Sequence, residues 1–187
     1  MAPSATSNGQ DGSGKIQFDT FQNIINGKLI DAEQTRTGIN PANKKANAPV
    51  PISTTKDVDD AVKAAHEAFK SWSRTSVEER KKAVSAYAEG LKENRVEFAQ
   101  LLVKEQGKPM AMAQAEVDSG YHWLTENVKL ELPEVVEEET EERKVITRYT
   151  PLGVVAAIVP WNFPIQLAIG KIAPAVLTGN CIIVKPS

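Results

Sequence analysis

Asn162 is the side chain whose setting in this sequence best suits chemistry. It lies in the turn Pro160-Trp161-Asn162-Phe163-Pro164, between two apolar segments. A carboxamide N–H is a neutral donor that can stabilise a developing oxyanion without titrating. The structural alternative is that Asn162 caps a following helix, with Pro164 near the first helical position. The residue types alone leave both roles open.

The segments around this turn predict one βαβ unit. Residues 153–159 and 181–184 are short apolar runs typical of buried strands, and residues 165–177 are typical of a helix. In open α/β sheets, ligands bind beyond the carboxyl ends of the strands. The turn and the tail Lys185-Pro186-Ser187 both follow such ends, so both are predicted to lie where a ligand binds.

Lys185 ends the second predicted strand, near the level at which nucleotide-binding folds place a group for the adenine ribose. A lysine there can donate to ribose hydroxyls and tolerates a 2′-phosphate, so NAD and NADP both fit. Ser187 is a weaker candidate contact, and the alternative for Lys185 is a solvated lysine at a strand end. No Gly-x-Gly-x-x-Gly follows the first strand, so the pyrophosphate is not predicted to bind in the ordinary Rossmann manner.

Further segments occur in the order found in one known family. They are Asn40-Pro41-Ala42, residues 57–65, 105–109 and 149–154, the turn at 160–164, Gly179-Asn180 and Lys185-Pro186-Ser187. Together they resemble the aldehyde dehydrogenase superfamily over about residues 21–187. The resemblance implies an NAD(P)-dependent oxidoreductase that oxidises a small-molecule aldehyde to a carboxylic acid through a thiohemiacetal. It does not indicate which aldehyde.

The resemblance also implies roles for single residues. Asn162 matches the asparagine that supplies half of the oxyanion hole, and Lys185 matches the lysine that contacts the adenine ribose. The remaining matches line the cofactor or border the aldehyde tunnel, with core packing as the alternative. The cofactor-binding set is Ile158, Val159, Pro160, Trp161, Lys185 and Ser187, and the substrate set is Phe163 and Leu167.

The family's catalytic cysteine stands further along, in a Gly-Gln-x-Cys-like setting that this sequence lacks. The sole cysteine, Cys181, opens an apolar strand, where burial raises a thiol pKa and leaves the group inert. We therefore expect the N-terminal portion of an aldehyde dehydrogenase, truncated before the nucleophile and inactive alone. The alternatives are a non-catalytic fragment that binds a full-length homologue or nucleotide, and an incomplete gene model.

Composition argues against several other classes of protein. With 22 Lys plus Arg against 24 Asp plus Glu, the net charge is −2, and no basic stripe suits nucleic acid. One cysteine allows no internal disulfide or cysteine-based metal site, which suits a reducing compartment, and no metal is predicted. No apolar run reaches the ~18 residues of a membrane span. A cytoplasmic protein is expected.

Four helices are predicted before the βαβ unit. Asn26-Gly27 first predicts a tight hairpin, and residues 35–51 form a turn-rich stretch. The first helix, at 58–72, carries an apolar stripe that should face a core. The second helix is predicted to begin after a capping box at Ser76. The third is predicted to end at Gly107, and the fourth to span about 109–129.

The predicted fold class is α/β, a partial Rossmann-like cofactor-binding domain of N-terminal helices plus the first βαβ unit of a parallel sheet. The predicted segments are a disordered tail at 1–17, a helical part at 18–132, an acidic connector and arm strand at 133–150, and the incomplete βαβ at 151–187. Seven glutamates at 131–142 favour a solvated connector, and residues 143–150 a half-exposed strand. In the family, a β-hairpin here pairs with a neighbouring subunit of a homo-oligomer, but its usual partner strand lies beyond position 187.

Overall fold

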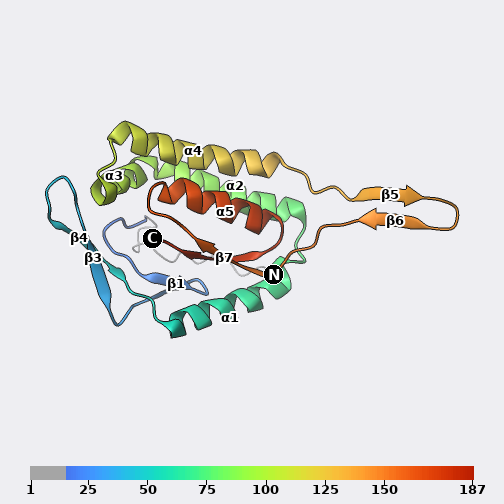
Figure 1. The fold of residues 1–187 in the computed structure, drawn as a ribbon, viewed down its shortest axis with the longest axis horizontal. Helices are drawn as coiled ribbons and strands as arrows, with labels where there is room; N and C mark the ends of the chain where they lie inside the picture. Colours follow the sequence, from blue (N-terminus) through green and yellow to red (C-terminus); the bar gives the residue numbers. More distant parts are fainter. Residues whose placement is uncertain (1–15) are drawn as a thin grey trace.

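The computed structural model describes residues 16–187 (Figure 1). Most of the predicted tail at 1–17 lies outside the described residues, and Ile16 and Gln17 are exposed. The first hairpin joins β1 (Asn23–Ile25) to β2 (Lys28–Ile30). Its turn residues, Asn26 and Gly27, have φ values of 52° and 69°. The predicted two-residue turn is therefore confirmed.

A second antiparallel pair follows, where a turn-rich stretch was predicted, and that prediction was wrong. β3 (Thr35–Ile39) pairs with β4 (Ala46–Pro51). Every residue of β3 is exposed, so the strand buries no face and shows no alternation of apolar and polar residues. Pro49 and Pro51 in β4 also weaken the strand signal, although proline is tolerated in a strand at a sheet edge.

Four helices then form the body, namely α1 (Thr55–Trp72), α2 (Val77–Glu93), α3 (Arg95–Gln106) and α4 (Met110–Lys129). The capping box predicted before α2 is present, because Ser76 accepts from the amide of Glu79, whose side chain bonds back to the Ser76 amide. α3 ends at Gly107, whose φ of 69° is the left-handed conformation that glycine tolerates.

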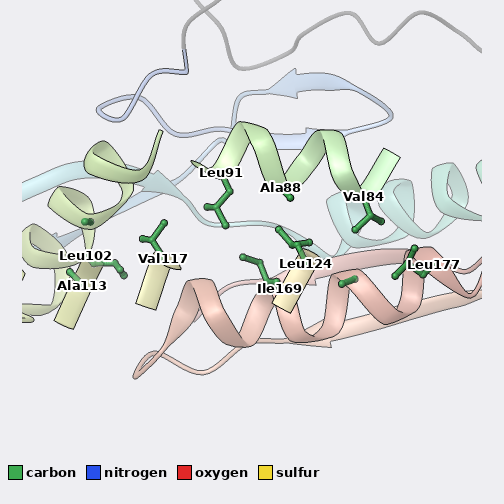
Figure 2. Packing of buried hydrophobic residues seen from close by; sticks show 11 residues of the cluster. Val84, Ala88, Leu91, Leu102, Ala113, Val117, Leu124, Ile169 and Leu177 are labelled. Carbon is green, nitrogen blue, oxygen red and sulfur yellow. The ribbon is translucent and has the colours of Figure 1, made fainter. Parts of the chain in front are cut away.

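The hydrophobic core lies among α2, α3, α4 and the later helix α5 (Pro164–Leu177), as Figure 2 shows. Its largest fully buried apolar side chains are Leu124 and Val117 of α4 and Ile169 of α5. The prediction that the stripe of α1 faces a core holds only in part, because no residue of α1 is fully buried and Val58 is 50% exposed. α1 packs instead on a sheet of two strands, which is too narrow to cover it.

The acidic segment forms an arm that extends from the body (Figure 1). β5 (Val135–Glu139) pairs with β6 (Lys144–Thr147), which confirms the strand predicted within 143–150. The connector predicted from the glutamate run over 131–142 was wrong for β5, and the β-hairpin that the resemblance implied is present. Glu139 pairs with Lys144 across the strands at 2.9 Å, and Glu138 pairs with Arg143 of the turn at 2.7 Å, which offsets the repulsion within the glutamate run.

The predicted βαβ unit closes the chain. β7 (Val154–Ile158) leads through α5 to β8 (Cys181–Lys185), and the two strands are parallel, in register from Val154 opposite Cys181 to Ile158 opposite Lys185. α5 and α1 both contact this sheet, and Figure 1 shows them on its opposite faces. The α/β class and the partial Rossmann-like arrangement are confirmed.

Candidate functional site

The carboxyl ends of β7 and β8 bring the predicted site residues to one edge of the sheet. Ile158 lies opposite Lys185 in the strand register, and the amide of Val159 donates to the Lys185 carbonyl at 3.0 Å. The chain then leaves β7 through the turn at 160–163 and enters α5 at Pro164. Residues separated by more than twenty positions in the sequence thus meet at the edge where α/β folds bind ligands.

Asn162 is exposed, and its carboxamide has no hydrogen-bond partner within residues 16–187. It does not cap the following helix. The N-cap of α5 is Phe163, and no side chain from that position bonds to the helix. Because nothing in the described part of the chain occupies the amide N–H groups of Asn162, they are available to a ligand.

The backbone of this turn is held by the segment that joins α3 to α4, which the sequence analysis did not identify as functional. The side chain of Gln106 donates to the carbonyl of Trp161. Lys108 Nζ donates to the carbonyl of Asn162 at 2.9 Å and lies 4.2 Å from the ring centroid of Phe163. The available signal was the match at residues 105–109, which supported the family resemblance but carried no role.

Glu116 of α4 is a second residue that the sequence analysis missed. Its side chain is fully buried, and its Oε1 accepts from the amides of Ile165 at 2.9 Å and Gln166 at 3.4 Å. Its Oε2 pairs with Lys108. A neighbouring helix therefore supplies the acceptor for the α5 N-terminus that the sequence of α5 itself lacks. The signal in the sequence was a charged residue between Ala113 and Val117 on the apolar face of α4.

The other predicted site residues differ in accessibility. Ile158 and Trp161 are 72% and 71% exposed, and Pro160, Lys185 and Ser187 are also exposed. Phe163 is 38% exposed and Leu167 is half-buried, so their side chains also contribute to packing. Val159 is 3% exposed, so its side chain belongs to the interior and only its backbone is at the edge. The Ser187 carbonyl accepts from Arg36 at 3.0 Å.

Cys181 stands at the opposite end of the sheet from Asn162, because it begins β8 where Lys185 ends it. It is half-buried, and this burial raises the pKa of its thiol, as the sequence analysis expected of a structural cysteine. Among residues 16–187, no group of three or more His, Cys, Asp or Glu side chains could hold a metal ion. No helix in that range has both the length and the apolar character needed to cross a bilayer.

Comparisons with known proteins agree with this geometry. FUS7 of Gibberella fujikuroi is 44% identical over 172 residues, which cover 92% of this chain and 37% of FUS7. The solved structure of 3,6-anhydro-L-galactose dehydrogenase in complex with NAP is similar with a TM-score of 0.83 and 30% identity, over 89% of this chain and 36% of that one. Betaine aldehyde dehydrogenase from Staphylococcus aureus in complex with NAD+ gives a TM-score of 0.80 and 32% identity, over 89% and 34%.

This chain therefore spans about a third of the length of these relatives. The profile of the aldehyde dehydrogenase family matches residues 29–187, which include the βαβ unit, the turn at 160–164 and the segment that holds it. On that match, the chain belongs to the aldehyde dehydrogenase family.

Proposed function

We propose that this chain contributes the oxyanion donor and part of the nucleotide site of an NAD(P)-dependent oxidation of an aldehyde to a carboxylic acid. Because the chain spans about a third of its relatives, the proposal concerns the steps that its own residues can perform. The observation that carries it is the exposed carboxamide of Asn162, without a partner in residues 16–187, at the carboxyl edge of a parallel strand.

Asn162 acts when a thiolate adds to the carbonyl carbon of the aldehyde. The addition forms a carbon–sulfur bond and leaves the former carbonyl oxygen as an alkoxide, in a thiohemiacetal. The amide N–H groups of Asn162 donate to that oxygen and stay neutral throughout, so they stabilise the transition state more than the uncharged aldehyde. No cysteine lies at this edge within residues 16–187, so the thiolate is not supplied by the described chain.

The same edge fits the sugar of a dinucleotide. Lys185 is exposed and pairs with no carboxylate in residues 16–187, so its ammonium is available to ribose hydroxyls. Ile158 and Trp161 offer exposed apolar surface beside it. Bound there, the nicotinamide would accept a hydride from the substrate carbon. NAD and NADP both fit, in line with relatives solved with NAP and with NAD+.

A chimera tests the proposal, with residues 16–187 replacing the matching region of FUS7. We expect it to reduce NAD or NADP when an aldehyde is supplied. Asn162→Ala should lower turnover by about 10²- to 10³-fold, because one oxyanion donor is removed. Lys82→Met, which removes an exposed lysine of α2 away from the turn, is the matched surface control and should leave turnover unchanged. A chimera that binds dinucleotide and keeps full turnover with Asn162→Ala would contradict the oxyanion role.

A second candidate is a non-catalytic role in which the chain binds a full-length homologue or a nucleotide. The observation that favours it is exposed apolar side chains beside the two-stranded sheet of β7 and β8, with Ile158 at the end of β7 72% exposed and Leu152, just before β7, 93% exposed. Unpaired strand edges and apolar patches of this kind promote association. Size-exclusion chromatography of the chain with and without FUS7 tests this role, and a monomer that never co-elutes with FUS7 counts against it.

A further inference from the structure

We infer that the buried ion pair of Lys108 and Glu116 is a positioning device for the turn that carries Asn162. The pair contacts the chain at Asn162 and at the residues that follow it, Phe163, Ile165 and Gln166. The meaning of this positioning for catalysis rests on the proposed function. The mechanical inference, that the pair fixes the turn, rests on the contacts alone.

Both charges are buried, with exposed fractions of 9% for the Lys108 side chain and 0% for that of Glu116. Burying two charges is costly, and apolar residues of similar size are often at least as stabilising as such a pair. Stability alone is therefore a weak reason for an ion pair at this place. Its contacts suggest a more specific role.

Within residues 16–187, the side-chain hydrogen bonds and the ring contact that the pair makes outside itself all go to the turn or to the start of α5. Lys108 donates to the Asn162 carbonyl at 2.9 Å and faces the ring of Phe163 at 4.2 Å. Glu116 accepts from the amides of Ile165 and Gln166. The pair thus holds the chain at Asn162, which has a predicted role in chemistry, and at the N-terminus of α5.

The turn has few other means of holding its shape. Pro160 and Pro164 have no amide N–H to donate. Within residues 16–187, the carbonyls of Trp161 and Asn162 accept only from the side chains of Gln106 and Lys108. Those two donors flank Gly107, whose left-handed conformation lets the chain reverse between α3 and α4. A side chain at Gly107 would also meet Pro41 at 2.7 Å, so this reversal is itself tightly packed.

The test uses the chain labelled with 5-fluorotryptophan and two local measurements. Amide exchange of Ile165 and Gln166 reports on Glu116. The ¹⁹F signal of Trp161 reports on the turn, and that of Trp72, whose indole donates to Val176 at 3.2 Å, reports on the rest of the fold. We expect Glu116→Leu to accelerate exchange at both amides by about 10- to 100-fold, because a charged acceptor is lost. Lys108→Met should shift or narrow the Trp161 signal and leave Trp72 unchanged.

Two further variants make the result decisive. Asp118→Asn breaks an exposed ion pair with Arg95 two residues along the same helix and should change none of these signals. The double variant Lys108→Met with Glu116→Leu leaves no unpaired buried charge, so it should fold with a thermal midpoint near that of the parent. It should still show fast exchange at Ile165 and Gln166 and an altered Trp161 signal.

The inference is overturned if the double variant keeps slow exchange at both amides and an unchanged Trp161 signal. It is also overturned if Trp72 changes together with Trp161, because the pair then serves general stability. These outcomes are independent of catalysis. An inactive chimera with the expected exchange and fluorine results would remove the proposed function and leave the positioning role standing.

Discussion

The close approach of α4 and α5 predicts that the same substitution has different effects at two helical glycines. A Cβ at Gly170 of α5 would lie 2.5 Å from Cζ3 and 2.9 Å from Cε3 of Trp123, a ring of α4 that packs against the core. A Cβ at Gly90 of α2 would meet nothing within 4 Å. Neither glycine has positive φ, so alanine suits the backbone at both positions. The two sites differ in the space around the added methyl group.

Gly90→Ala should stabilise the chain by about 0.5 to 1 kcal/mol, because alanine loses less backbone entropy in a helix. Gly170→Ala gains the same amount and adds an overpacking cost of about 1 to 3 kcal/mol, because the rigid ring must move. The difference in unfolding free energy between the two variants isolates that cost. It corresponds to a gap of about 2 to 12 °C in thermal midpoint for a chain of this size.

Urea and thermal unfolding, followed by circular dichroism, measure this gap directly. The expected order of stability is Gly90→Ala above the parent and Gly170→Ala below Gly90→Ala. Equal midpoints for the two variants would refute the packing of α5 against Trp123. Because α5 begins directly after the turn at 160–163, such a result would also count against the position of that turn beside α4.

Three further substitutions or modifications test other parts of the fold. Ser76→Ala should lower stability by about 1 kcal/mol in urea unfolding, because α2 loses its capping side chain. Arg80→Met should cost about 1 to 3 kcal/mol in the same assay, because the buried guanidinium donates to the Leu177 carbonyl at 3.1 Å and that carbonyl loses its partner. Burial raises the pKa of the Cys181 thiol, so its rate of alkylation by iodoacetamide should stay low at neutral pH. The rate should rise only at a pH above the pKa of a free thiol, about 8.5, whereas the chain unfolded in urea should react at lower pH.

The sequence predicted the elements that local patterns encode. Apolar runs around the turn at 160–164 indicated the βαβ unit, Asn26-Gly27 indicated a two-residue hairpin, and Ser76 indicated the start of α2. Each of these signals lies within a few residues of the feature that it specifies. Parallel pairing of the two apolar runs then follows, because one crossover helix joins them.

The features that were missed depend on contacts between distant residues. Lys108 and Glu116 hold residues about fifty positions away, and neither lies in a local pattern that identifies its partner. β3 was missed because it buries no face. The glutamate run alone did not indicate β5, because its charges pair only with the turn and strand that follow, although the resemblance implied a hairpin there. The half-exposed stripe of α1 could not be foreseen, because its burial depends on the width of the sheet beneath it.

The measurement that tests the central claim most directly compares Asn162→Asp with Asn162→Ala in the FUS7 chimera. Aspartate keeps the shape of the side chain but replaces the amide donor with a negative charge facing the alkoxide. Donation by Asn162 predicts that Asn162→Asp turns over no faster than Asn162→Ala, with both about 10²-fold or more below the parent. Turnover with Asn162→Asp near that of the parent would contradict the account, because shape alone would then suffice.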